Sequence, residues 1–250
     1  MINALQKVSI LADSLAMPRP PGEGDLRLEE TYPYLLDQLC RQRLGTEAPI
    51  FIERGKRFRT IDQVVDDWPE GVIVKQADIA IVQVGIADCA PRVFSRRQHT
   101  MVSALPKSLR EAVISFVHTH RRRILSLRPD CVYVKEKCFH EQVFHLATLA
   151  RRENAAKLIF VNIIRPTDAM EKRSPGFRSK VEAYNAWLAK YVDQEHVFLQ
   201  DLQAQVDAGG SDKLTIDGIH LSREGHRGLA TALSEQLSTL LSPSSAEAYA

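Results

Sequence analysis

Three residues that could perform nucleophilic catalysis lie near opposite ends of the sequence. Ser14 follows the apolar run Val8-Ser9-Ile10-Leu11-Ala12, and Asp217 and His220 stand three positions apart near the C-terminus. A serine hydroxyl becomes a useful nucleophile only when a neighbouring base takes its proton. The spacing of Asp217 and His220 lets a carboxylate meet an imidazole on one turn, orient it and stabilise its protonated form. We therefore expect Ser14, His220 and Asp217 to act together, provided that the fold joins them.

Each of these signals also has a simpler structural interpretation. A serine after a strand commonly caps a turn, and an aspartate and a histidine before a helix commonly serve as capping and surface residues. Their joint placement favours catalysis, because one follows the first apolar run and the others directly precede the last helical segment. Asp13 is expected to organise the turn around Ser14 rather than to titrate.

The elements that must position these residues alternate along the chain. Apolar runs predict strands and apolar stripes of helical period predict helices: strands at 8–12, 49–52, 78–84, 158–161 and 196–199, and helices over 31–44, 109–124, 139–152, 181–191 and 222–240. This alternation predicts a parallel sheet covered by helices on both faces, in one domain spanning residues 1–250 with a flexible tail at 242–250. Ligands of such sheets bind beyond the carboxyl ends of the strands, where Ser14 and the Asp217 segment are expected.

The composition narrows the class of protein. Of the 250 residues 44% are apolar, and the net charge is only +2. No run approaches the roughly 20 apolar residues of a membrane helix, and the N-terminus lacks the pattern of a secretory signal. The four cysteines include no C-x-x-C pair, which argues against a disulfide framework or a zinc site. We expect a cytoplasmic protein with no metal or other cofactor and no membrane or nucleic-acid partner; the oligomeric state stays open.

Three short motifs carry a resemblance to a known family. Ala12-Asp13-Ser14-Leu15 resembles the G-D-S-L block of the SGNH (GDSL-type) hydrolases, and Asp217-Gly218-Ile219-His220 resembles their D-x-x-H block. Gly85-Ile86-Ala87-Asp88 stands where the family has G-x-N-D. The resemblance implies an α/β protein with a three-layer α/β/α, flavodoxin-like fold and a mostly parallel five-stranded sheet. It also implies ester hydrolysis or acyl transfer by a Ser14–His220–Asp217 triad, without a metal.

The chain departs from the family pattern at two oxyanion-stabilising positions. Ala87 replaces an asparagine that donates a hydrogen bond, and loss of such a donor typically lowers the rate by roughly 10²–10³-fold. The second position is a glycine in the family's second conserved block, which donates to the oxyanion through its backbone N–H. It aligns with Arg57-Phe58 here, and any residue other than proline keeps a backbone N–H. Arg92 is the candidate replacement donor, and Asp88 is expected to anchor its loop by hydrogen bonding. The candidate oxyanion and substrate-binding residues are thus Arg57, Phe58, Gly85, Ala87, Asp88 and Arg92.

Basic residues crowd the expected rim of the site: Arg54, Lys56, Arg57, Arg59, Arg92, Arg96 and Arg97. They form either a solvated face or a surface that recognises an anionic substrate through charge-assisted hydrogen bonds. Nucleic acid is not favoured, because no aromatic platform is interleaved with these charges. The Arg121-Arg122-Arg123 run is expected on a solvated helix flank, and residues 86–105 are expected to form an exposed, mobile loop.

These observations favour a serine esterase or O-deacylase that acts on an acylated carbohydrate or another small ester, neutral or anionic. The string from Gly85 to Arg92 resembles a subgroup of the family associated with bacterial surface polysaccharides, which points to an acylated sugar. Two alternatives stay open. The same acyl-enzyme could pass its acyl group to a sugar hydroxyl, as an O-acetyltransferase does, or the fold could serve polysaccharide biosynthesis as a catalytically weak or inactive binding protein.

Overall fold

The computed structural model of the chain describes residues 5–128, 130–152 and 155–241, and the side chain of Arg54 is not described. The tail expected at 242–250 lies outside these residues. Within the described ranges, no helix is both long and apolar enough to cross a membrane.

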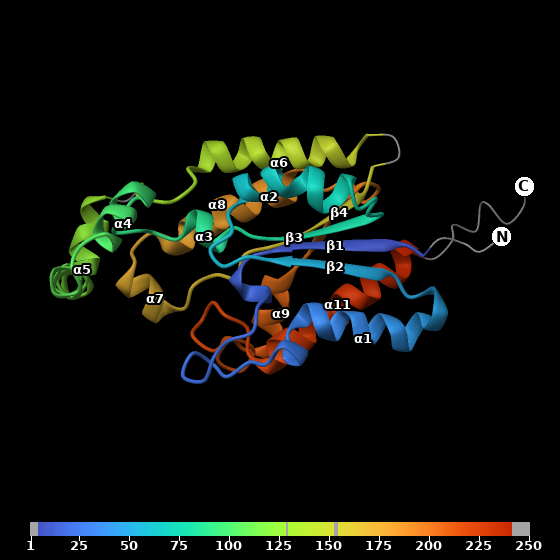
Figure 1. Ribbon diagram of the computed structural model, residues 1–250, viewed down its shortest axis with the longest axis horizontal. Coiled ribbons are helices and arrows are strands. Elements are labelled where there is room, and N and C mark those ends of the chain that lie inside the picture. The colour runs from blue at the N-terminus through green and yellow to red at the C-terminus, as the bar shows by residue number, and fades with distance from the viewer. Residues whose placement is uncertain (1–4, 129, 153–154, 242–250) are drawn as a thin grey trace, which may run out of the picture.

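A five-stranded sheet forms the centre of the molecule, with the strand order β2-β1-β3-β4-β5 (Figure 1). The strands are β1 (Lys7–Ala12), β2 (Ile50–Gly55), β3 (Ile79–Gln83), β4 (Lys157–Val161) and β5 (Val197–Gln200). Every neighbouring pair is parallel, with Ile10 opposite Ile81 and Ile81 opposite Ile159 in register. The five predicted strands and the predicted fold class are therefore confirmed.

Helices cover both faces of this sheet. One layer holds α1 (Tyr32–Leu44), α9 (Leu202–Gly209) and α11 (Arg223–Leu241), and the other holds α2 (Ile61–Trp68), α6 (Glu136–Ala150) and α8 (Phe177–Lys190), as Figure 1 shows. Alternate residues of each strand pack against opposite helix layers, because successive side chains of a strand point to opposite faces of the sheet. Ile81 packs into the first layer, and its neighbour Val82 packs into the second. Both faces of the central strands are apolar for this reason.

Two further helices, α4 (Arg96–Ser103) and α5 (Lys107–Leu127), stand apart from these layers. The segment expected to be a loop at 86–105 contains α4 and the short helix α3 (Ile86–Cys89), and the capping box of Ser95 with Gln98 begins α4. The predicted helix at 109–124 is present as α5 (Lys107–Leu127), but Leu125 is its only buried residue. Leu109 and Phe116 are more than half exposed. Together α4 and α5 form a hairpin that projects from the sheet (Figure 1).

The carboxyl ends of the strands determine where a site can form. Because all five strands run in the same direction, their carboxyl ends meet at one edge of the sheet. The turn after β1, α3 after β3, α7 (Asp168–Arg173) after β4 and the segment that precedes α11 all gather near this edge (Figure 1). The topology thus brings Ser14 and the Asp217 segment to the same end of the molecule, as the parallel arrangement predicts.

Candidate active site

Ser14 begins a single 3-10 turn directly beyond β1. The carboxylate of Asp13 caps this turn by accepting a hydrogen bond from Leu15 N at 2.8 Å, and Asp13 N donates to Gln83 O of β3 at 3.0 Å. The expected turn-organising role of Asp13 matches these contacts. Burial raises the pKa of Asp13 to about 7, against hydrogen bonding by Leu15 and the charge of Arg59. Ser14 itself is partly exposed, so its hydroxyl is accessible at the strand end.

Asp217 and His220 form a tight hydrogen-bonded pair. Asp217 Oδ2 lies 2.7 Å from His220 Nδ1, and Asp217 Oδ1 accepts from the backbone nitrogens of Ile219 and His220 at 3.1 and 2.8 Å. Burial alone would raise the pKa of Asp217, but hydrogen bonds from the side chain and backbone of His220 lower it to about 2. A carboxylate at Nδ1 favours the tautomer that carries its proton there, which leaves Nε2 free to act as a base.

The turn between these two residues requires a glycine. Gly218 has φ +84° and donates from its backbone N–H to Thr215 Oγ1 at 3.1 Å. A Cβ at this position would also lie 2.6 Å from Thr167 Cγ2. Ile216 N donates to His220 O at 2.7 Å and closes the turn. The spacing of the D-x-x-H motif therefore depends on one left-handed residue that only glycine adopts without strain.

Several contacts join the segment after Ser14 to the segment around His220. Arg223 Nη2 donates to Asp25 O at 2.7 Å, and Arg223 Nε pairs with Glu30 at 2.7 Å. His226 is buried, and its Nδ1 accepts from Tyr32 N at 3.0 Å. Burial lowers the pKa of His226 to about 4, which keeps its ring neutral and able to accept. These contacts fix α11 against the start of α1.

The structure does not hydrogen-bond Ser14 to His220. Among the described residues, none accepts from or donates to the Ser14 hydroxyl, whereas the pair of Asp217 and His220 is complete. In unliganded sites such catalytic hydrogen bonds are often long and tighten only when substrate binds. The contact between nucleophile and base stays a prediction.

The turn that carries Arg57 and Phe58 follows β2. Lys56 N donates to Ala12 O of β1, which fixes the turn beside the Ser14 turn. Phe58 has φ +58°, a conformation that glycine adopts freely and a bulky residue adopts only with strain. This backbone matches the position of the second-block glycine better at Phe58 than at Arg57. No described residue accepts from the Phe58 N–H, which is therefore available to a ligand.

The helix α3 and the residues that flank it carry the other expected oxyanion residues. Gly85 has φ +126°, and a Cβ there would meet Ile163 Cδ1 at 2.4 Å. Asp88 is fully buried and accepts from Ile61 N at 2.9 Å, so it anchors the start of α2 to this loop, as expected. Burial raises the pKa of Asp88 to about 8. Ala87 is buried and offers only a methyl group and its carbonyl oxygen, which accepts from Arg92 Nη2 at 3.4 Å.

The basic residues that were expected to face solvent differ in their exposure and in their partners. Arg59 is not on the rim: its side chain is 2% exposed and pairs with Asp67. Arg57 and Arg96 are more than one-third exposed. Arg121, expected to be solvated, instead donates to Ser174 Oγ and Pro91 O. Sequence alone could not reveal these pairings, because each partner is supplied by a different segment.

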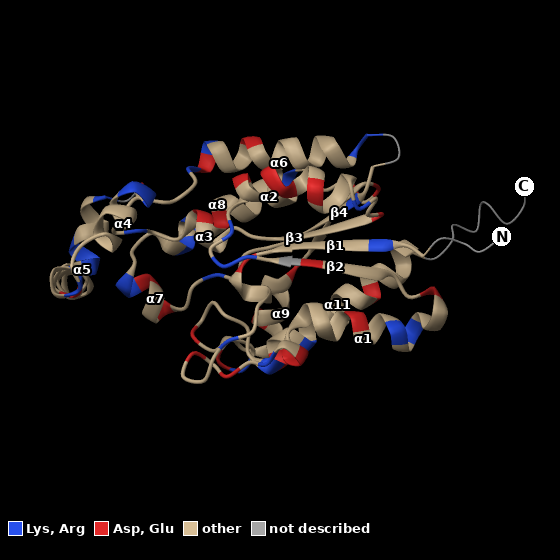
Figure 2. Ribbon diagram, viewed as in Figure 1, with Lys and Arg blue, Asp and Glu red and all other residues tan. Residues whose placement is uncertain are grey.

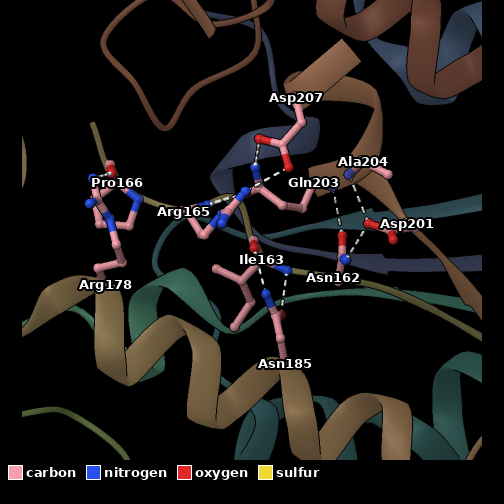
Figure 3. Close-up of polar contacts among 10 residues, drawn as sticks. All are labelled: Asn162, Ile163, Arg165, Pro166, Arg178, Asn185, Asp201, Gln203, Ala204 and Asp207. Atoms are coloured by element: carbon pink, nitrogen blue, oxygen red, sulfur yellow. Dashed lines mark hydrogen bonds and ion pairs between the residues drawn. The ribbon is translucent and has the colours of Figure 1, made fainter. Parts of the chain in front are cut away.

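A polar network that the sequence did not reveal fixes the segment after β4 (Figure 3). Asn162 donates to Asp201 Oδ1 at 2.7 Å and accepts from Gln203 N at 3.0 Å. Asn185 both donates to and accepts from the backbone of Ile163 at 2.8 Å. These bonds tie β4 to β5 and α8. The same segment leads to Thr167, whose side chain lies against Gly218.

Comparisons with known proteins identify the family and agree with the fold. The model of the GDSL-like lipase/acylhydrolase family matches residues 13–227. A search of the curated proteins finds no significant match. Among solved structures, the lipase/acylhydrolase from Enterococcus faecalis is 15% identical, with a TM-score of 0.64, over 96% of this chain and 99% of that one.

Two further solved structures share the fold. A mutant of Axe2, an acetyl-xylooligosaccharide esterase from Geobacillus stearothermophilus, is 18% identical with a TM-score of 0.61, over 93% of this chain and 94% of that one. The α/β hydrolase LAE5 from the metagenome of Lake Arreo, Spain, is 16% identical with a TM-score of 0.62, over 94% and 96%. Identities this low establish a common fold alone.

Proposed function

The chain belongs to the GDSL-like lipase/acylhydrolase family, a family of carboxylic ester hydrolases, and we propose that Ser14, His220 and Asp217 are its catalytic triad. The observation that carries this proposal is the 2.7 Å contact between Asp217 Oδ2 and His220 Nδ1. It fixes the ring and its tautomer, and it places a charged carboxylate where the imidazolium forms during attack. The Ser14 turn lies at the same sheet edge and in the position of the G-D-S-L block.

The reaction proceeds through an acyl-enzyme. Ser14 Oγ attacks the ester carbonyl carbon while His220 Nε2 accepts the hydroxyl proton. The tetrahedral intermediate then collapses, and the imidazolium returns that proton to the leaving alkoxide. Water then gives a proton to His220 and attacks the acyl-Ser14 carbonyl. The second tetrahedral intermediate collapses, and the imidazolium returns this proton to Ser14 Oγ as the acid is released. Asp217 orients the ring and stabilises its positive charge in both halves of the cycle.

The oxyanion of each tetrahedral intermediate needs donors, and three are available. The backbone N–H groups of Ser14 and Phe58 have no acceptor among the described residues. Arg92 lies against the carbonyl of Ala87 and is the third candidate. Since Ala87 supplies no side-chain donor, the intermediate is stabilised less than in a site with an asparagine there.

The proposed substrates are O-acylated carbohydrates or other small esters. The shared fold with an acetyl-xylooligosaccharide esterase supports this class. A second candidate function is binding without efficient turnover. Ala87 favours it, because it removes one oxyanion donor while the Asp217–His220 pair stays intact.

Covalent labelling with a fluorophosphonate, followed by intact-mass measurement, tests the triad. We expect wild type and Ser115→Ala to gain one phosphonyl group and Ser14→Ala to gain none. Ser115 is a matched control, because it is exposed on α5, far along the chain from the motifs. If folded wild type stays unlabelled, or if Ser14→Ala is labelled as fast as wild type, the proposed nucleophile is wrong and the binding function is favoured.

A further inference from the structure

A cavity of about 560 Å³ lies beside the loop that carries Ala87. It is bounded by the Phe58 turn, the segment after α3, and the helices α4 and α5. Its charged lining is cationic: Arg57, Arg92, Arg96 and Arg121. Among the described residues no aspartate or glutamate lines it. Figure 2 shows basic residues in α4, in α5 and in the loops that face them.

The four arginines differ in how their charges are balanced. Arg57 pairs with Glu23 at 4.0 Å, and Arg96 pairs with Asp62 at 3.2 Å. Arg92 and Arg121 have no carboxylate within 4.0 Å among the described residues. Two positive charges therefore share one cavity, and within the described part of the chain neither forms an ion pair with a carboxylate.

Neutral groups hold both of these guanidinium groups in place. The Arg92 guanidinium lies 4.5 Å from the centre of the Tyr133 ring and donates to Ala87 O, while its Nε is buried and has no acceptor. Arg121 Nε donates to Ser174 Oγ at 3.1 Å, and its Nη2 donates to Pro91 O at 3.0 Å. Aromatic stacking and carbonyl acceptors orient an arginine without neutralising it.

Burying charges of one sign together is unfavourable unless a counter-charge joins them. Burial lowers the pKa of both arginines. The charges of Arg173 and Arg92 lower the pKa of Arg121 further, whereas Tyr133, Cys89 and Asp88 act in the opposite direction on Arg92. An arginine stays protonated under such conditions, so the repulsion persists in the free protein. An anion in the cavity would relieve it and accept the unused N–H donors.

We propose that this cavity binds an anionic group of the ester substrate, with Arg92 and Arg121 as its main contacts. The inference rests on the proposed function, because Phe58 and Arg92 belong both to the cavity and to the expected oxyanion site. The chemistry recognised is that of an oxyanion, a carboxylate or a phosphate, since the planar guanidinium group binds both in bidentate fashion. The substrate is thus an ester whose acid or alcohol part carries this anion a short distance from the reacting carbonyl.

Hydrolysis of matched esters tests the proposal. The anionic substrates are 4-acetoxybenzoate and 4-acetoxyphenyl phosphate, and the neutral one is methyl 4-acetoxybenzoate, each rate being divided by that of uncatalysed hydrolysis. We expect wild type to prefer at least one anionic ester in kcat/KM by about tenfold or more, because a charge-assisted hydrogen bond is worth that factor. The better of the two anions identifies the group that the cavity accepts.

Arg121→Gln tests whether the cavity causes the preference for an anionic ester, and Arg122→Gln is its control. Arg122 is exposed, lies one residue away on the same helix and does not line the cavity. We expect the anionic-to-neutral ratio to fall about tenfold in Arg121→Gln, to be partly retained in Arg121→Lys, and to stay unchanged in Arg122→Gln. Since the ratio compares two substrates on one sample, a smaller folded fraction cancels. An equal ratio in wild type and Arg121→Gln would overturn the proposal.

Calorimetric titration separates this proposal from the proposed function. The probes are the product analogues 4-hydroxybenzoate, 4-hydroxyphenyl phosphate and methyl 4-hydroxybenzoate, titrated into wild type and Arg121→Gln at fixed ionic strength. If no ester is cleaved but wild type binds an anionic probe more tightly than Arg121→Gln does, the cavity is an anion site and the esterase proposal fails. If esters are cleaved and no anionic probe binds more tightly than the neutral one, the anion site is wrong and the esterase proposal stands.

Discussion

The two sides of the candidate site are built in different ways. The acid–base side, Asp217 and His220, lies within one short turn, and its hydrogen bonds span three residues or fewer. The oxyanion and binding side takes residues from the Phe58 turn, the segment after α3, α4, α5 and the segment around Tyr133. On the first side the carboxylate is satisfied by the protein itself. On the second, among the described residues, the Phe58 N–H has no acceptor and the charges of Arg92 and Arg121 have no carboxylate partner.

This difference shows which side a substrate must complete. A satisfied carboxylate–imidazole pair is ready to accept a proton before any ligand arrives, so its contribution to catalysis is preorganised. The open donors of Phe58 and Arg92 gain their partners only from the substrate. Variants on the acid–base side should therefore slow the chemical step for every substrate. Variants on the binding side should change the substrate preference and the kcat/KM values.

The largest effect is expected for Ser14→Ala. Without the nucleophile no acyl-enzyme forms, and kcat for 4-nitrophenyl acetate should fall by roughly 10⁴–10⁶-fold. Stopped assays with active-site titration measure it, and Ser115→Ala should keep the wild-type rate. A fall of less than tenfold in Ser14→Ala would show that neither side of the site works through this serine.

Asp217→Asn should reduce kcat by roughly 10³–10⁴-fold. The amide can donate to Nδ1, which favours the wrong tautomer of His220 and places the proton on Nε2. The matched control is Asp212→Asn, an exposed carboxylate five residues earlier, which should retain wild-type kcat. Equal rates for the two variants would mean that the 2.7 Å contact orients nothing that the reaction uses.

Buried ionisable groups on the two sides should respond to pH with opposite signs. The pKa of His226 falls from 6.5 to about 4 on folding, so the unfolded chain binds the proton more readily. The contribution of His226 to the free energy of unfolding is fully present above pH 6.5. It decreases by about 3 kcal/mol as the pH falls toward 4. Urea unfolding of wild type against His226→Asn measures this: the difference between them should shrink as the pH falls from 7 to 4.

On the other side, the pKa of Asp88 rises from 3.8 to about 8 on folding. The folded state binds this proton more readily than the unfolded chain does. The contribution of Asp88 to the free energy of unfolding is therefore fully present below pH 3.8 and is lost as the pH rises toward 8. Asp88→Asn imitates the protonated acid and should gain on wild type as the pH rises from 5 to 8. If both variants shift stability in the same direction with pH, the electrostatic contrast between the sides is wrong.

A smaller effect is expected for Ala87→Asn, which adds a donor to the binding side. We expect kcat to rise about tenfold, below the full value of an oxyanion donor, because Ala87 is buried and a larger side chain is accommodated with strain. Ala87→Val adds similar bulk without a donor and should not raise kcat. Thermal unfolding of both variants separates lost stability from changed chemistry.

The sequence predicts the sheet well for a physical reason. Buried parallel strands are apolar on both faces, so β1 and β3 are visible as continuous apolar runs. The Asp217–His220 pair is equally visible, because its residues are neighbours in the chain. The capping box of Ser95 and Gln98 signalled a helix in a segment expected to be a loop, and that signal could have been used.

Other features depend on contacts that periodicity does not encode. The apolar stripe of residues 109–124 predicts a helix, but it cannot tell whether anything covers Phe116. The burial of Arg59 depends on Asp67, and the orientation of Arg121 depends on Ser174 and Pro91. The left-handed backbone of Phe58 contradicts its residue type and could be found only from the fold.

The weak attachment of the α4–α5 hairpin has a consequence for ligand binding. Of its two helices, α4 has no buried residue and α5 has one, so the hairpin can detach at a much lower free energy than the sheet can unfold. We expect each such opening to withdraw Arg96 and Arg121 from the cavity and to lower the apparent affinity for an anion in proportion to the time that the hairpin is open. A bound anion would in turn slow amide hydrogen exchange in α4 and α5 and leave the exchange of β1 and β3 unchanged.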